Sequence, residues 1–311
     1  MNNTTPHLKP GSTKWRTTIT GSKLAAILGI SPYQSPARAW LEMRGDIDPE
    51  PTNPAMMRGT IQEASILEWF FTITRPDIEK LADETTFTHP DLEWAAANPD
   101  AVANEDGQIV FIEAKSIARD GGTWGTPGTD QVPLYYYTQV IWAMHMTHHD
   151  GGHRVRRTYI IKHGPYVDQY DVYPIDYDPM VGQELQARAH EFYLSLSDDD
   201  GLPPASEMAG EHKVFAKIHP DIDRDLNWEI NPELAAEYIK ARQWSKDAEA
   251  RESRVKAEIL RVMGNARSAV CNGHTVAYRR PTRNGVSLYP PQRLPELIEL
   301  TNPNIETQEE A

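Results

Sequence analysis

One short segment, Gln108 to Ile117, constrains the fold of this chain more than any other. Its residues alternate as in a β-strand, so Phe111, Glu113 and Lys115 share one face while the residues between them point to the other. Successive residues on one face are about 6.5–7 Å apart, so Glu113 could bind a metal ion while Lys115 reaches a neighbouring water or phosphate. The segment therefore predicts a strand whose charged face takes part in metal binding and catalysis.

An acidic residue upstream extends this pattern. Asp100 follows Asn98-Pro99 and is separated from the strand by a polar turn. Hydrolysis of a phosphodiester needs positive charge at the phosphate and an activated water, and carboxylates that hold Mg²⁺ meet both needs. The candidate metal ligands are Asp100, Glu113, Glu63 and the backbone carbonyl of Ala114. Lys115 would orient the attacking water or stabilise the pentacovalent charge, so the residues predict metal-assisted hydrolysis.

Simpler interpretations of the same residues stay open at this point. The chain has 45 acidic residues, so an Asp followed by Glu-x-Lys also arises by chance. Glu63 could be a helix-surface carboxylate that pairs with Arg58, and Gln139 could be an exposed helix residue. Trp124, in the loop Gly121 to Gly128, could contact DNA or cap a hydrophobic loop.

Composition narrows the class of protein. The net charge of −14 argues against a protein that coats nucleic acid nonspecifically, because neutralisation of phosphates drives such binding. The single cysteine, Cys271, excludes an internal disulfide and a cysteine-ligated iron–sulfur cluster. No stretch approaches the roughly 20 apolar residues of a membrane span, and Met1 to Thr13 lacks the apolar core of a signal peptide. We therefore expect a cytoplasmic protein with no membrane partner.

Four histidines lie close together in the sequence, as in some zinc sites, but the other ligands of such a site are missing. His145, His148, His149 and His153 follow one another closely, without a matching carboxylate or cysteine pattern. We therefore expect no zinc site.

The periodicity of the chain predicts an α/β fold with a mixed central sheet flanked by helices. Helices are expected at Ser22 to Leu28, Pro36 to Met43, Thr60 to Phe71, Pro133 to about His148 and Met180 to Leu196. Strands of the sheet are expected at residues 85–88, 94–97, 108–117, 157–162 and 169–173, with a polar turn at residues 104–107.

A boundary follows at Pro203-Pro204, so we expect one domain over residues 1–204 and a second region over residues 205–311. Pro232 to Met263 is predicted to be helical, either as a coiled-coil arm or as an α-hairpin. Ser268 to Arg280 is predicted to form a β-hairpin that turns at Asn272-Gly273. This region would serve assembly or DNA contact. The acidic end, Ile305 to Ala311, should be frayed.

Five ordered motifs together resemble the YqaJ-like viral recombinases, the lambda exonuclease family, within the PD-(D/E)xK nuclease superfamily. They are Gly21-Ser22-x2-Ala25-Ala26-Ile27-Leu28-Gly29-Ile30-Ser31-Pro32-Tyr33, Arg58-Gly59-x3-Glu63, Ala97-Asn98-Pro99-Asp100, Ile112-Glu113-Ala114-Lys115 and Pro133-x2-Tyr136-x2-Gln139-Val140. The resemblance covers roughly residues 18–200 and implies a restriction-endonuclease-like core.

The resemblance also implies a role for each matching residue. Asp100 and Glu113 would be metal ligands, and Lys115 would be the catalytic lysine. Glu63 would be a helix carboxylate beside the metals, and Gln139 would brace the site. Two more residues, Arg16 and Ser22, would match a pocket for a DNA 5′-phosphate, and Trp124 and Arg58 are candidate DNA contacts. The chain departs from the family at Ala101, where glycine is frequent, and at Ile141, where a second glutamine is frequent.

The implied function is a Mg²⁺-dependent 5′→3′ exodeoxyribonuclease on double-stranded DNA ends, with Mn²⁺ able to substitute. It would leave 3′ single strands for an annealing protein and form a homo-oligomeric ring in a bacterial or phage-infected cell. Two alternatives remain: a restriction-type endonuclease on the same fold, and a non-catalytic recombination protein that binds DNA ends.

Overall fold

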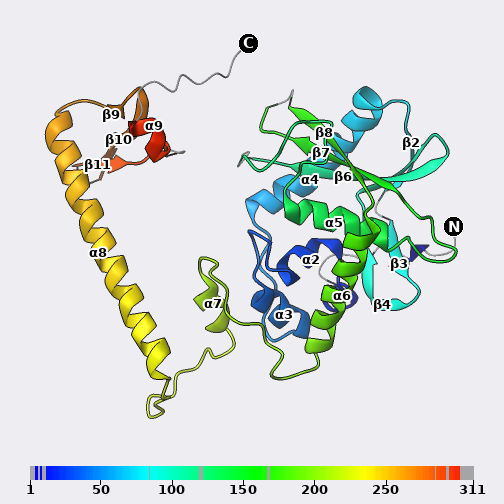
Figure 1. Cartoon of the computed structure of the whole chain (residues 1–311), viewed down its shortest axis with the longest axis horizontal. Coiled ribbons are helices and arrows are strands. Elements are labelled where there is room, and N and C mark those ends of the chain that lie inside the picture. The colour runs from blue at the N-terminus through cyan, green and yellow to red at the C-terminus, as the bar shows by residue number, and fades with distance from the viewer. Residues whose placement is uncertain are drawn as a thin grey trace. The chain divides into compact units, whose positions relative to one another are not determined.

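The computed structural model describes residues 4–5, 8, 12–83, 85–118, 122–166, 169–283, 285–291 and 294–301. The expected frayed end, Ile305 to Ala311, and most of the segment Met1 to Thr13 lie outside these residues. The chain divides into two compact units, Met1–Ile222 and Asp223–Ala311, and each is described by itself (Figure 1).

The first unit begins with helices that are delimited by caps. They are α1 (Thr13–Thr17), α2 (Gly21–Ile27), α3 (Pro36–Arg44) and α4 (Pro54–Trp69), which continues as a π-helical turn, η1 (Phe70–Thr74). The Ser35 side chain accepts a hydrogen bond from the backbone of Arg38, and Asn53 caps α4 in the same way. Proline at the first position of both helices fits, because its missing N–H has no intrahelical partner there. Helix α4 thus starts at Pro54, well before the predicted Thr60, and places Glu63 in its interior.

A mixed five-stranded sheet forms the centre of the first unit, and this confirms the predicted fold class. Its strands, in spatial order, are β2 (Glu79–Asp83), β5 (Ala101–Glu105), β6 (Gln108–Ser116), β7 (Arg157–His163) and β8 (Tyr170–Asp176). Strands β6 and β7 run parallel, and the other neighbours are antiparallel. The predicted turn at residues 104–107 is too long, since only Asp106 and Gly107, both with positive φ, lie outside β5 and β6. Strands β2 and β5 were not predicted.

Two predicted strands lie outside the central sheet. Strands β3 (Thr86–His89) and β4 (Leu92–Ala97) pair with each other, and β3 pairs with β1 (Thr4–Thr5) in a separate three-stranded sheet. The prediction that they join the central sheet is therefore wrong. Alternation identifies a strand from its own residues, but the choice of partner depends on contacts that are distant in sequence.

Helices cover both faces of the central sheet. Helices α5 (Leu134–His145) and α6 (Pro179–Ser195) pack with Phe111 in one cluster, where Trp142 is fully buried and donates to the carbonyl of Ala96 (3.1 Å). Helix α4 covers the other face, in a cluster that contains Val110 and Ile112. The predicted alternation of β6 is confirmed, and its two faces meet different helices. A fully buried large apolar side chain contributes roughly 1.5–3 kcal/mol, so these two layers fix the sheet firmly.

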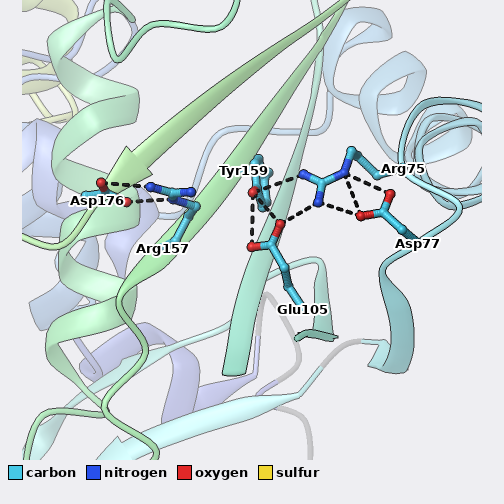
Figure 2. Close-up of polar contacts among 6 residues, drawn as sticks. All are labelled: Arg75, Asp77, Glu105, Arg157, Tyr159 and Asp176. Carbon is cyan, nitrogen blue, oxygen red and sulfur yellow. Dashed lines mark hydrogen bonds and ion pairs between the residues drawn. The ribbon is translucent and has the colours of Figure 1, made fainter. Parts of the chain in front are cut away.

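A polar network holds the end of α4 and η1 to the sheet (Figure 2). Arg75, which follows η1, donates to the Tyr159 hydroxyl (3.1 Å) on β7 and forms an ion pair with Glu105 on β5. The Tyr159 hydroxyl in turn donates to Glu105 (2.8 Å). Glu105 lies at the opposite end of β5 from Asp100, and Tyr159 lies opposite Ile112 on β6, so the network anchors the helix that carries Glu63.

The segment after α6 still belongs to the first unit. Helix α7 (Glu211–Phe215) buries Val214 in the cluster that also contains Trp142. Throughout the described part of the chain, no helix combines the length and the apolar character that a membrane span requires.

The second unit contains one long helix and a small sheet. Helix α8 (Pro232–Met263) is continuous, so the predicted α-hairpin is wrong and the single helix is correct. Strands β9 (Ser268–Cys271), β10 (His274–Thr282) and β11 (Gly285–Tyr289) form an antiparallel sheet, followed by α9 (Leu297–Thr301). The predicted hairpin is confirmed, with positive φ at Asn272 and Gly273, but its third strand was missed.

Candidate active site

Glu113, Lys115 and Gln139 contact one another at the end of β6. The Lys115 Nζ donates to Glu113 Oε1 at 2.6 Å and to Gln139 Oε1 at 3.2 Å. The Gln139 amide, on α5, also donates to Glu113 Oε1. Glu113 is 3% exposed, and a buried carboxylate of this kind is stable only when it is paired and hydrogen-bonded. Gln139 therefore holds both charged groups in place.

Asp100 reaches the same site through the pairing of β5 with β6. Ala101 lies opposite Ile112, so Asp100, just before the strand, comes beside the backbone of Ala114. The Ala114 N–H donates to Asp100 Oδ2 at 2.7 Å. The surrounding protein and the nearby Glu113 raise the pKa of Asp100 well above its ordinary value. Two carboxyl groups are thus held close together, in a place where Asp100 resists ionisation.

Lys115 counters this negative charge. Burial alone lowers the pKa of its ammonium, but the charges of Glu113, Asp100 and Glu63 outweigh burial and raise the pKa above its ordinary value. The ammonium also lies 4.9 Å from the centre of the Tyr136 ring, a cation–π contact that sequence reasoning missed. The structure thus surrounds Lys115 with groups that favour its charged form.

A cavity of about 460 Å³ brings residues from several elements to this cluster. The predicted residues among those that line it are Ser22, Glu63, Asp100, Glu113, Lys115 and Gln139. The sequence thus predicted a set of residues that are distant along the chain and adjacent in space. Trp15 and Thr60 also line the cavity but were not predicted.

Arg16 lies apart from this set. It lines a separate small pocket with Lys23, a lysine that is 8% exposed. Lys23 Nζ donates to the backbone carbonyls of Trp15, Arg16 and Thr18 and so caps the end of α1. Burial lowers the pKa of Lys23 to about 7. Lys23 is therefore a buried structural residue and not part of a basic surface, whereas a role for Arg16 and Ser22 at a 5′-phosphate remains a prediction.

Arg58 serves as a link between α4 and the end of β6. It donates to Gln62 Oε1 (2.9 Å) on its own helix and to the carbonyl of Ile117 (3.4 Å). Ser116 donates to the same Gln62 oxygen. Gln62 was not singled out from the sequence, because a polar residue one position before Glu63 carries no distinguishing pattern.

Trp124 packs within the protein. Its ring lies 5.5 Å from that of Tyr136 and 5.1 Å from that of Tyr173, and the Lys162 ammonium lies over it. These contacts match the hydrophobic-loop interpretation, and a DNA contact at Trp124 remains a prediction. The loop itself is described from Gly122 onward.

The donor set fits a hard divalent cation such as Mg²⁺. Among the described residues, no group of three or more His, Cys, Asp or Glu side chains is arranged to hold a metal ion. Mg²⁺ nevertheless commonly binds through one or two carboxylates, retained waters and substrate phosphates. Asp100 and Glu113 supply two carboxylates, and burial together with the nearby Glu113 raises the pKa of Asp100 even though the Lys115 ammonium opposes that shift. A bound cation would supply further positive charge.

Residues 13–150 match the family model of the YqaJ-like viral recombinase domain, which confirms the resemblance found in the motifs. No curated protein matches the chain. Among solved structures, it resembles an alkaline exonuclease from Laribacter hongkongensis (18% identity, 58% of this chain and 88% of that one, TM-score 0.44). It also resembles a phage-related exonuclease from Haemophilus somnus 129PT (14% identity, 59% and 96%, TM-score 0.42). At these TM-scores, neither likeness supports a conclusion about the function of this chain.

Proposed function

We propose that this protein, whose residues 13–150 carry the YqaJ-like viral recombinase domain, is a Mg²⁺-dependent exodeoxyribonuclease that acts on the ends of double-stranded DNA. One observation carries the proposal. Lys115 donates to Glu113 while the backbone beside it holds Asp100, so a lysine and two carboxylates of the PD-(D/E)xK pattern converge in one cavity.

The charged Lys115 and the neutral Gln139 have different roles in the proposed reaction. Lys115 directs its ammonium into the cavity, where it orients the attacking water and offsets the negative charge that develops on the phosphate. Gln139, which contacts both Lys115 and Glu113, is a positioning residue. It fixes the distance between the Lys115 ammonium and the Glu113 carboxylate, and the rate of hydrolysis depends on that distance.

Asp100, Glu113, Glu63 and the Ala114 carbonyl would hold Mg²⁺, and Mn²⁺ would substitute. When bound, the cation supplies positive charge near the phosphate and makes a nearby water more acidic. Asp100 is aimed by the Ala114 N–H, so its second oxygen remains available to face the cavity.

The finer features of the proposal rest on the family resemblance. The enzyme would degrade the 5′-ended strand, leave a 3′ single strand for an annealing protein, and act as a homo-oligomeric ring in the cytoplasm. Arg16 and Ser22 would receive the 5′-phosphate. Of these two, Ser22 lines the cavity with Lys115, and this supports a phosphate position close to the cluster.

The test uses purified protein with Mg²⁺ and linear duplexes that bear or lack a 5′-phosphate, each labelled at one end. We expect the 5′-ended strand to shorten, faster when it is phosphorylated, and chelation of the metal to stop the reaction. If neither strand shortens with Mg²⁺ or Mn²⁺, the proposal is wrong.

Circular duplex DNA separates the alternatives. An enzyme that requires ends leaves a covalently closed circle intact, whereas a restriction-type endonuclease linearises it. A non-catalytic end-binding protein would instead bind linear duplexes without shortening them, and Lys115→Ala would not change its behaviour.

A further inference from the structure

The sequence of the second unit contains a long basic stretch in an otherwise acidic chain. Between Glu258 and Glu296 there is no aspartate or glutamate, although the whole chain has a net charge of −14. The same stretch contains six arginines, namely Arg261, Arg267, Arg279, Arg280, Arg283 and Arg293. A surface of this sign favours a polyanionic partner.

The small sheet arranges part of this stretch as a face with aromatic rings. Tyr278 on β10 lies directly opposite Tyr289 on β11, and Arg280 lies opposite Ser287 two residues along. Residues two apart on a strand share a face, so the two tyrosines and Arg280 point the same way. The Arg280 guanidinium lies 4.6 Å from the centre of the Tyr278 ring and 5.6 Å from that of Tyr289.

The opposite face of the same two strands is the inner one. Ala277 and Leu288, which alternate with the tyrosines, are 5% and 7% exposed. Arg280 is exposed and Tyr289 is 39% exposed. Arg280 and Tyr289 are thus presented outward on a sheet whose opposite side buries Ala277 and Leu288, so burial within the sheet does not account for them.

We propose that this outward face, formed by Tyr278, Arg280 and Tyr289, binds single-stranded DNA. Successive bases would stack on the tyrosine rings, and arginines would pair with the phosphates. The preference for a single strand follows from the rings, because base faces are free for stacking in a single strand and are covered in a duplex. This site would engage the kind of strand that the proposed nuclease leaves, but its binding requires no cleavage.

The test measures binding of the full-length protein to a fluorescein-labelled oligothymidylate by anisotropy, with EDTA present and at several salt concentrations. Tyr289→Leu, which keeps an apolar residue in the strand but removes the π face, should weaken binding about tenfold, whereas Tyr289→Phe should retain it. Arg280→Ala should weaken binding and reduce the salt slope by about 0.7 for each phosphate that is no longer neutralised.

Matched substitutions on the first unit serve as controls. Arg188→Ala and Tyr166→Ala remove exposed residues of the same kinds and should leave oligothymidylate binding unchanged. Lys115→Ala should abolish cleavage yet retain this binding, so failure of the nuclease proposal would not be confused with failure of this one.

Three results would overturn the inference. The first is equal binding by the Tyr289→Leu and Tyr289→Phe variants. The second is that a blunt duplex binds more tightly than oligothymidylate and that Arg280→Ala weakens this duplex binding. The third is unchanged DNA binding by Arg280→Ala together with a smaller assembly in light scattering, which would make the face a subunit interface.

Discussion

Gly21 packs against Gln139 so closely that no side chain fits between them. A Cβ on Gly21 would lie 2.8 Å from the Gln139 carbonyl oxygen and 3.1 Å from its Cγ. Because Gln139 contacts both Lys115 and Glu113, the start of α2 sets the position of the charged pair. The glycine at this point serves close approach of two helices and thereby the geometry of the site.

Replacement of Gly21 by alanine should therefore impair catalysis more than folding. We expect Gly21→Ala to lower kcat by about tenfold to a hundredfold, since a displacement near 1 Å at a catalytic group can cost that much. Overpacking should also cost about 1–3 kcal/mol of unfolding free energy. Gly59→Ala is the folding control: a Cβ at Gly59 would meet nothing within 4 Å, so the helix should gain stability. Unaltered kcat in Gly21→Ala would contradict the argument.

Lys115 and Gln139 should act as one unit in catalysis. Lys115→Met should reduce kcat by about a hundredfold to a thousandfold, the usual effect of removing one stabilising donor. Gln139→Ala should lower kcat less, and the double variant should be hardly worse than Lys115→Met alone. Single-turnover rates measure this, with Lys80→Ala as a control, because Lys80 pairs with Asp83 on the edge strand β2. Additive losses would show that Gln139 works independently of Lys115.

Mg²⁺ should stabilise the folded protein through Asp100. At a Mg²⁺ concentration a hundred times Kd, linkage predicts a gain of about 2.7 kcal/mol. Asp100→Asn should lose most of that gain, yet without metal it should be no less stable than the parent. The reason is that asparagine can still accept from the Ala114 N–H and does not repel Glu113. Thermal unfolding with and without Mg²⁺ measures both effects, and Asp48→Asn, at an exposed position, should behave like the parent. A full Mg²⁺ shift in Asp100→Asn would exclude Asp100 as a ligand.

Stability should fall in mild acid because of one buried and two half-buried histidines. Burial lowers the pKa of His89, His145 and His148 below the ordinary value of about 6.5. His145 accepts from the Tyr177 hydroxyl and donates to Gln186, both at 2.7 Å, which satisfies a neutral ring. With a lowered folded pKa, the unfolded chain binds more protons below about pH 6.5, so the stability present above that pH is lost as the pH falls.

Chemical denaturation at pH 7.5 and at pH 5.5 or below checks this prediction. The unfolding free energy should be smaller at the lower pH, and His145→Gln should reduce the difference between the two values. A difference that His145→Gln leaves unchanged would show that His145 does not contribute to the acid sensitivity.

The candidate site was more predictable than the topology around it. The alternation of β6 placed Glu113 and Lys115 on one face, and the ordered motifs joined Glu63, Asp100 and Gln139 to them. Strand β5 was missed because the segment Ala101 to Glu105 is short and its residues do not alternate between apolar and polar. The burial of Lys23 could not be predicted, because a lysine in a sequence carries no sign that three backbone carbonyls will surround it.

The sequence by itself determined the local elements and the set of chemical residues, because periodicity and motif order are properties of neighbouring positions. Only the tertiary structure decided which strands pair, that Ala114 would hold the Asp100 carboxylate, and that Gly21 would set the position of Gln139. Those relationships join residues far apart in the chain, and they depend on burial and steric fit between surfaces that exist only after folding. The charged face of β6 was thus visible in the sequence, whereas the cavity that surrounds it was not.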